Sequence, residues 1–386
     1  MSGPPFPPEQ LDRLLAEQDV AAVLATSAHN VRHLLGGYRF FLYATLDGIG
    51  HDRYLPFVGY VAGRPEAAFY VGAGNEAWGT DATPLWVPDL ALEAWTAADA
   101  ARIAGARLRD AGLARGRIGV ELPYLTADAF TALRDALPHA DLVDVSHPLE
   151  ELRAVKRRDE LDLMRRGATA VVDAMLATFA ATRVGASERE IVERLRIEET
   201  RRGLGFGYCL IASGDSATRG PSDRRLAPGD VLSLDSGAHF DGYVADLTRM
   251  AVAGEPTRRH QQLLDQILAV QEAARDAARG GRRGGAIFDA ADAAIREQAD
   301  GARMTFLAHG TGLLSHEAPR LTDSGSPPYP ATHRERPLRP GQVLSIETHL
   351  IDPLIGFVKL EDTVIVTAGA CEPCGDHGRG WTVIDA

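Results

Sequence analysis

Four acidic side chains lie inside apolar runs that have the length of β-strands. Asp235 and Asp246 belong to the stretch LSLDSGAHFDGYVADLTRM, and Glu347 and Glu361 belong to QVLSIETHLIDPLIGFVKLEDTVIVT. Burying an ionised carboxylate without a partner is costly, and carboxylates placed close together repel one another. A fold that buries all four needs cations among them. This requirement restricts the chain more than any other feature of its sequence.

The dipeptide Asp241-Gly242 predicts a tight hairpin in the first stretch, because two-residue loops need the positive φ that these residues tolerate. With this loop, Asp235 lies opposite Thr248, and Asp246 is its diagonal neighbour on the same face. That separation suits two carboxylates converging on metal ions. The alternative interpretation is a solvated strand face that happens to carry two acids.

The second stretch turns between Pro353 and Gly356. Glu347 and Glu361 share a face only if this loop has an odd number of residues or one strand bulges. Centred on Leu354, the hairpin places the two glutamates directly opposite each other.

A histidine lies between the two hairpins in sequence. His309 begins HGTGLLSHEAP, a glycine-rich turn that follows a strand-like run and also contains His316. Four carboxylates and this imidazole form an oxygen-rich ligand set that balances two divalent ions in charge. Such ligands suit Mn²⁺ best, and Co²⁺, Fe²⁺ and Zn²⁺ are also compatible.

The length of 386 residues and the order of the elements predict two domains. Strands alternate with helices in residues 1–147, which indicates an α/β domain. Residues 148–386 read twice as two helices followed by a hairpin, which predicts an α+β domain with an internal pseudo-repeat. The segment 145–155 is the expected linker.

Composition excludes several classes of function. The net charge of −12 argues against nucleic-acid binding. Residues 1–8 lack the features of a signal peptide, and no stretch approaches the ~20 apolar residues of a membrane span. The three cysteines are too few for a disulfide framework, so we expect a cytoplasmic protein. Cys371 and Cys374 are half of a zinc motif without a second half, and we expect a C-terminal loop there.

Together these motifs resemble the pita-bread metallopeptidases: methionine aminopeptidase, aminopeptidase P and prolidase, with creatinase as a metal-free relative. NVRHLLGG at 30–37 looks like the N-terminal domain of creatinase and prolidase, and ELRAVK at 151–156 resembles the entry to the catalytic domain. The five ligands match in order and type, with HGTG around the histidine and LEDTVIV around the last glutamate. The pattern looks closest to small bacterial Xaa-Pro dipeptidases.

The resemblance implies a role for each ligand. Asp246 and Glu361 would bridge two ions, Asp235 would hold one, and His309 and Glu347 would hold the other. A water bridging both metals would attack the scissile carbonyl, with Glu347 as general base.

The resemblance also implies residues that contact the substrate. His316 would stabilise the tetrahedral intermediate. His349 shares the face of Glu347 and is a candidate for a substrate contact, although a structural histidine is the simpler interpretation. A partner subunit can border the active site in relatives, so Tyr38 or Arg39 is a candidate to reach the substrate, possibly in trans. The alternative is that Phe40 and Phe41 pack in the core and Arg39 lies on the surface.

Three positions depart from the family pattern. The segment 214–223 lacks the loop histidine, Ile351 replaces a tyrosine, and Lys359 replaces an arginine. Lysine keeps the charge but loses the planar guanidinium. These changes leave the metal ligands intact and affect the substrate contacts, Lys359 among them.

The predicted function is hydrolysis of Xaa-Pro dipeptides by a homodimer or tetramer. The alternative on the same scaffold is a hydrolase of a small non-peptide C–N bond, similar to creatinase or ectoine hydrolase. A non-catalytic binding protein is a third interpretation, disfavoured because all five ligands are present.

Overall fold

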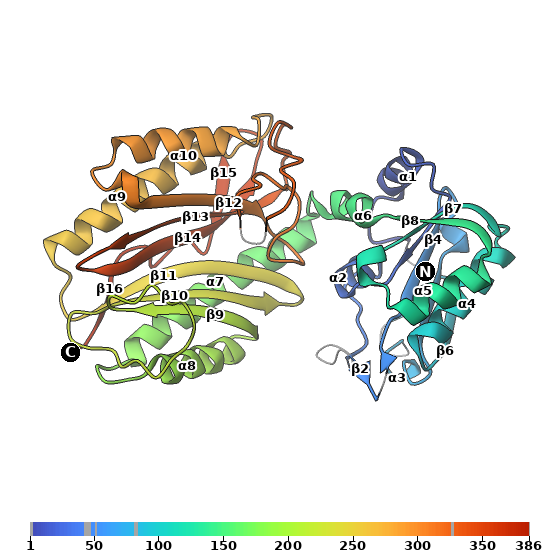
Figure 1. Ribbon diagram of the computed structural model, residues 1–386, viewed down its shortest axis with the longest axis horizontal. Coiled ribbons are helices and arrows are strands. Elements are labelled where there is room, and N and C mark those ends of the chain that lie inside the picture. Colours follow the sequence, from blue (N-terminus) through green and yellow to red (C-terminus); the bar gives the residue numbers. More distant parts are fainter. Residues whose placement is uncertain (1–2, 42–47, 51, 81–83, 326–327, 386) are drawn as a thin grey trace. The chain divides into compact units, whose positions relative to one another are not determined.

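The computed structural model divides into two compact units, Met1–Arg153 and Ala154–Ala386 (Figure 1). None of the helices in the described part of the chain is both long and apolar enough to cross a bilayer. The structure describes residues 3–41, 48–50, 52–80, 84–325 and 328–385.

The first unit has the predicted α/β architecture. Its elements are α1 (Pro8–Ala16), β1 (Ala22–Ala25), α2 (Ala28–Leu34), β2 (Gly48–Ile49), β3 (Asp52–Arg53), β4 (Phe57–Val61), η2 (Pro65–Ala67), β5 (Phe69–Ala73), α3 (Ala77–Thr80), β6 (Asp89–Ala94), α4 (Ala97–Asp110), β7 (Arg115–Val120), η3 (Leu122–Tyr124), α5 (Ala127–Ala136), β8 (His139–Asp144) and α6 (Ser146–Arg153). Six strands form a sheet in the order β6-β5-β4-β1-β7-β8. The sheet is mixed, because β1 runs antiparallel to β4 and parallel to β7.

The boundary between the two units falls inside the expected linker 145–155, between Arg153 and Ala154, but most of this segment is helix α6 and not a loop. Leu149 and Leu152 lie three residues apart on one face of α6 and are buried in the same core as Leu11 and Leu15 of α1. This apolar pair gives the segment a packed side, which a linker lacks.

The second unit repeats one arrangement of elements. Its elements are α7 (Arg158–Ala181), α8 (Glu188–Arg201), β9 (Gly205–Ser213), β10 (Val231–Phe240), β11 (Tyr243–Ala253), α9 (Arg258–Ala277), α10 (Ala286–Glu297), η4 (Gly301–Arg303), β12 (Met304–Gly310), β13 (Val343–Asp352), β14 (Gly356–Val366), β15 (Cys371–Cys374) and β16 (Thr382–Ile384). The main strands follow the order β12-β13-β14-β11-β10-β9 (Figure 1). Each half contributes two helices and three strands, which confirms the pseudo-repeat.

Two details of this unit differ from the sequence-based expectations. Strand β9 was not predicted, because its glycines and its partly exposed residues obscure a clear alternation. Cys371–Cys374 is not a loop but strand β15, which pairs with β14 beside the main order of strands. Its backbone groups are used in that pairing.

Both predicted hairpin registers are confirmed. Asp241 and Gly242 have φ of 47° and 87°, and Asp235 pairs with Thr248. In the second hairpin Asp352 pairs with Gly356, which leaves a three-residue loop centred on Leu354 and places Glu347 opposite Glu361.

The alternation of side chains along the strands divides the sheet into two faces. Leu234 and Leu247 pack in one core with α7 and α8, and Leu344 and Val364 pack in another with α9 and α10. Residues one position away point to the opposite face. That face carries all four predicted carboxylate ligands.

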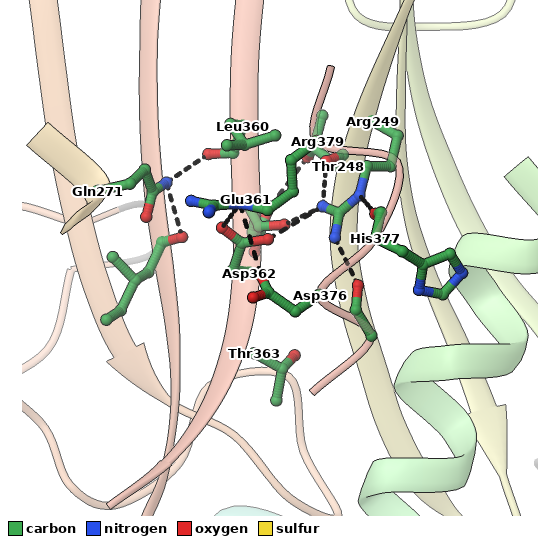
Figure 2. Close-up of polar contacts among 12 residues, drawn as sticks. Thr248, Arg249, Gln271, Leu360, Glu361, Asp362, Thr363, Asp376, His377 and Arg379 are labelled. Carbon is green, nitrogen blue, oxygen red and sulfur yellow. Dashed lines mark hydrogen bonds and ion pairs between the residues drawn. The ribbon is translucent and has the colours of Figure 1, made fainter. Parts of the chain in front are cut away.

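A buried arginine joins the two halves on the helix-covered face. Strand β11 pairs with β14 at Thr248 and Glu361. The Arg249 guanidinium donates to the backbone oxygens of both, at 2.8 and 2.9 Å, and forms an ion pair with Asp362 at 3.1 Å (Figure 2). From α9, Gln271 donates to the carbonyl of Leu360 (Figure 2). These contacts fix the backbone beneath Glu361.

The seam between the two halves, where β11 pairs with β14, should depend on Asp362. Its carboxylate and the Arg249 guanidinium are both fully buried. We expect Asp362→Ala to lower the free energy of unfolding by about 3–5 kcal/mol, because it leaves a buried guanidinium without its counter-ion. Asp376→Asn is the matched control: Asp376 belongs to the same network but its side chain is 35% exposed, so the cost should stay below about 1 kcal/mol. Urea denaturation measures both, and equal losses would contradict this account.

Candidate metal centre

The predicted ligands converge in one cavity of about 420 Å³ in the second unit. Asp235 comes from β10, Asp246 from β11, Glu347 from β13 and Glu361 from β14. This volume is in the range of small-ligand sites. The lining also includes Tyr208, Leu210, Arg219, Thr305, Phe306, Leu307, His309, His316, Ser324, Gly325, His349 and Lys359.

His309 presents one ring nitrogen to the carboxylates. Its Nδ1 lies 3.2 Å from the carbonyl oxygen of Gly310, which can only accept, so Nδ1 carries the proton. Its Nε2 lies 3.9 Å from Glu347 Oε1 and is available as a ligand. One ligand atom each from Asp246, His309 and Glu361 lie within 4.8 Å of one another, and all three residues are buried.

Asp246 has an oxygen that lacks a partner. The hydroxyls of Tyr208 and Ser315 donate to its Oδ2 at 2.7 and 2.9 Å. Its Oδ1 is buried and has no hydrogen-bond partner among the described residues. Burial and the neighbouring Glu361 raise the pKa of Asp246 to about 7. The free Oδ1 of Asp246 and the neighbouring ligand atoms of His309 and Glu361 therefore fit a bound cation.

The reach of Tyr208 depends on a glycine. A Cβ at position 237 would overlap the Tyr208 ring, which shows that the ring passes directly over Gly237. Only glycine permits this approach, which brings the hydroxyl to Asp246.

Lys359 is the central cation of the carboxylate cluster. Its Nζ lies 2.7 Å from Asp235, 2.5 Å from Glu347 and 2.8 Å from Glu361. Burial alone would lower the pKa of this lysine, but the glutamates outweigh burial and raise it. For Glu361 the directions are reversed: burial alone would raise the pKa of this carboxyl, but Lys359 lowers it to about 2.

A second cation, Arg219, was missed from the sequence. It lies between β9 and β10, in the segment 214–223, and its guanidinium contacts Asp235. Tyr208 and Ser315 were missed as well. The only available signal was an arginine sixteen residues before Asp235, and nothing in the local pattern showed that the segment folds over the sheet.

The two candidate substrate histidines both line the cavity. His316 stacks on His309 with ring centroids 3.7 Å apart. Burial and His309 lower the pKa of His316 to about 3. Burial, Lys359 and Arg219 lower the pKa of His349 to about 4. Both imidazoles are therefore neutral at pH 7.

The N-terminal candidates lie in the first unit. The Tyr38 hydroxyl is buried and donates to Glu76 at 2.9 Å, and Arg39 lines a cavity within the same unit. Phe40 is buried as expected, but Phe41 is 64% exposed, so the expectation that both pack in the core is wrong for Phe41. A contact of Tyr38 or Arg39 with the substrate stays a prediction.

Comparisons with known proteins connect this geometry to one family. The sequence model of metallopeptidase family M24 matches residues 162–368, and that of the creatinase/prolidase N-terminal domain matches residues 9–155. The chain is 27% identical over 259 residues to the Xaa-Pro dipeptidase of Pyrococcus furiosus, covering 65% of this chain and 71% of that protein. It is 28% identical over 261 residues to the uncharacterized peptidase YqhT of Bacillus subtilis, covering 65% and 70%.

Solved structures extend the likeness to nearly the whole chain. The Xaa-Pro dipeptidase from Bacillus anthracis superposes with a TM-score of 0.79 at 22% identity, covering 97% of this chain and 99% of that chain. At this identity the likeness shows a shared fold alone.

Lys359 and a divalent ion would compete for the same oxygens, so Lys359→Met should strengthen metal binding. We expect a lower Tm without metal and a larger rise in Tm on adding Mn²⁺, because the stabilisation by the ion grows by about 1.4 kcal/mol for each tenfold gain in affinity. Lys156→Met is the matched control, because Lys156 is equally buried against Glu317 but does not line the cavity. Scanning calorimetry with and without Mn²⁺ tests this, and an unchanged Mn²⁺ shift in Lys359→Met would refute it.

The lowered pKa of His349 should make the metal-free protein sensitive to acid. A histidine in the unfolded chain has a pKa of ~6.5. Between pH 6.5 and 4 position 349 is therefore protonated in the unfolded chain and neutral in the folded protein. Stability from this group is present above pH 6.5 and is lost as the pH falls toward 4. We expect His349→Gln to reduce the pH dependence of the urea midpoint in this window. An identical slope for both proteins would contradict the burial of this imidazole.

Proposed function

The chain belongs to metallopeptidase family M24, and on this premise we propose that it hydrolyses dipeptides with proline in the second position. The observation that carries the proposal is the convergence of Asp235, Asp246, His309, Glu347 and Glu361 in one cavity. The cavity volume suits a substrate of dipeptide size, and one relative is named a Xaa-Pro dipeptidase.

We further propose that these five side chains hold two divalent ions. Four carboxylates supply four negative charges, and the unpartnered Oδ1 of Asp246 supports a cation at the centre of the cluster. The oxygen-rich set suits Mn²⁺ best, with Co²⁺, Fe²⁺ and Zn²⁺ also compatible. When bound, such ions lower the pKa of a water molecule and polarise the scissile carbonyl.

Glu347 is the carboxylate best placed to accept the proton of the attacking water. Its side chain is 12% exposed, whereas those of Asp235 and Glu361 are 3% and 2% exposed. A base must reach both the solvent-derived nucleophile and the reacting bond.

The neighbouring polar residues orient the ligands and the substrate. Tyr208 and Ser315 hold Asp246 through its Oδ2, which leaves Oδ1 free. His316 lies against His309 with its Nδ1 3.1 Å from the Tyr329 hydroxyl. Its neutral imidazole is in position to donate a hydrogen bond to an oxygen in the cavity that gains negative charge.

The quaternary structure and compartment belong to the same proposal. We propose a homodimer or tetramer, by analogy with the family that the sequence resembles, and a cytoplasmic location. Sedimentation velocity measures the first, and a monomer at micromolar concentration would contradict it.

The proposal predicts that Mn²⁺-loaded protein cleaves Xaa-Pro dipeptides and leaves Xaa-Pro-Yaa tripeptides and creatine intact. Asp235→Asn and Glu361→Gln should each lower kcat/KM by at least ~100-fold, since altering even the partners of metal ligands costs 10–100-fold. Asp241→Asn is the matched control, because Asp241 is an exposed turn residue of the same hairpin and Asn tolerates its positive φ. Cleavage of creatine alone would favour the non-peptide hydrolase, and full activity in Glu361→Gln would exclude the metal centre.

A further inference from the structure

Glu199 of α8 is a fully buried acid on the face of the sheet opposite the candidate metal centre. It contacts Ser236 of β10, which follows the proposed ligand Asp235 directly in the chain. Because side chains alternate along a strand, Ser236 points toward the helices while Asp235 points toward the cavity. The Oε2 of Glu199 is buried and has no hydrogen-bond partner among the described residues. An ionised carboxylate in this position would be costly.

The hydrogen bonds around Ser236 indicate the protonation state of Glu199. The Oγ of Ser236 lies 2.6 Å from Oε1 of Glu199 and 3.2 Å from the backbone oxygen of Tyr208. A hydroxyl has one hydrogen, and neither an ionised carboxylate nor a carbonyl oxygen can donate. Both contacts are hydrogen bonds only if protonated Glu199 donates to Ser236 and Ser236 donates to Tyr208.

The charged and titratable groups around Glu199 leave this proton in place. Burial raises the pKa of Glu199 to about 7, and the Ser236 hydrogen bond and the charge of Arg196 offset burial only in part. Arg196 lies on the same helix, and its guanidinium carbon is 4.1 Å from the centroid of the Phe206 ring. From β9, burial and Glu199 raise the pKa of the Cys209 thiol, which is therefore neutral at pH 7 and adds no charge.

Tyr208 connects this hydrogen-bond chain to the metal-binding face. Its backbone oxygen accepts from Ser236, and its hydroxyl donates to Oδ2 of Asp246 at 2.7 Å. The pairing of β9 with β10 is irregular between Gly237 and Ala238, where the regular backbone ladder is interrupted. The Ser236 hydrogen bond is therefore an additional tie between the two strands, next to the point where the Tyr208 ring crosses Gly237.

We propose that Glu199 is a positioning residue: as a neutral acid it holds Ser236, and through it Tyr208, in the arrangement that the metal centre needs. The inference rests on the proposed function. Loss of the proton would turn the Ser236 hydroxyl toward the carboxylate, remove this donor from the Tyr208 backbone and leave an unpaired charge in the core. The hold on Asp246 would then weaken as the pH rises, although Glu199 itself lies outside the cavity.

Glutamine is the matched replacement, because its amide can donate to Ser236 as the neutral acid does but cannot ionise. With Ala-Pro as substrate at pH 6, Glu199→Gln should keep kcat/KM within about threefold of wild type. Glu199→Ala should lower kcat/KM by about 10- to 100-fold and weaken Mn²⁺ binding in calorimetry, as is typical for groups that orient metal ligands.

The pH dependence of this comparison tests the proton itself. Between pH 6 and 8.5 the kcat/KM of Glu199→Gln should rise relative to wild type by at least about threefold, because only the wild-type group loses its proton near pH 7. The ratio cancels the titration of groups that both proteins share. A ratio that stays constant over this range would overturn the proposal.

Urea denaturation of the metal-free protein tests the same proton without activity. A glutamate in the unfolded chain has a pKa of ~4.3, so from pH 5 to 7 position 199 is ionised in the unfolded chain and largely neutral in the folded protein. Stability from this group is present below pH 4.3 and is lost as the pH rises toward 7. The wild-type urea midpoint should therefore fall relative to that of Glu199→Gln across this window.

Glu198→Gln is the control for both experiments. Glu198 is the preceding residue of α8, but it pairs with Arg201 and Arg202, and these arginines lower its pKa. Its ionisation is complete below this window in both states, so its difference from wild type should not vary between pH 5 and 8.5. A midpoint difference for Glu199→Gln that is equally constant would contradict a neutral Glu199.

The outcomes distinguish the two proposals. If wild-type protein cleaves no Xaa-Pro dipeptide, the proposed function fails, and the urea comparison still decides whether Glu199 is neutral. If wild-type protein cleaves Ala-Pro and folded Glu199→Ala matches it in kcat/KM and Mn²⁺ affinity, the dipeptidase activity stands and the positioning role of Glu199 is overturned.

Discussion

Repulsion among four neighbouring carboxylates, three of them buried, is the constraint on which the catalytic unit depends. The sheet places them on one face, and each is compensated in its own way. Lys359 contacts Asp235, Glu347 and Glu361, and Arg219 adds a second cation at Asp235. Asp246 instead accepts two hydroxyl hydrogen bonds and has a raised pKa. The same cluster is thus held together by its own cations and is prepared for divalent ions.

The parts of this cluster that depend on local rules could be predicted from sequence. Asp241-Gly242 sets one register, and the loop centred on Leu354 sets the other, so the pairing of Glu347 with Glu361 follows from counting residues. The parts that depend on tertiary contacts could not. Helix α6 is defined by leucines that pack on a distant helix, and Arg219 reaches the site because its segment folds back over β9.

The two faces of the sheet divide the work between stability and chemistry. On the helix-covered face, Arg249 binds the backbone of both central strands and pairs with Asp362 (Figure 2). On the other face, directly above, Thr248 donates to the Glu361 carboxylate at 3.1 Å. The pair Thr248 and Glu361 therefore connects the buried Arg249 network to a proposed metal ligand.

The two halves of the second unit contribute strands in mirrored order, so the proposed metal ligands come from both halves. Each half supplies two of the four carboxylates, and the innermost strands β11 and β14 meet at the centre. The first half contributes Asp235 and Asp246 and the second half His309, Glu347 and Glu361, so neither half supplies the whole ligand set. The complete ligand set therefore exists only while the two halves are paired at Thr248 and Glu361.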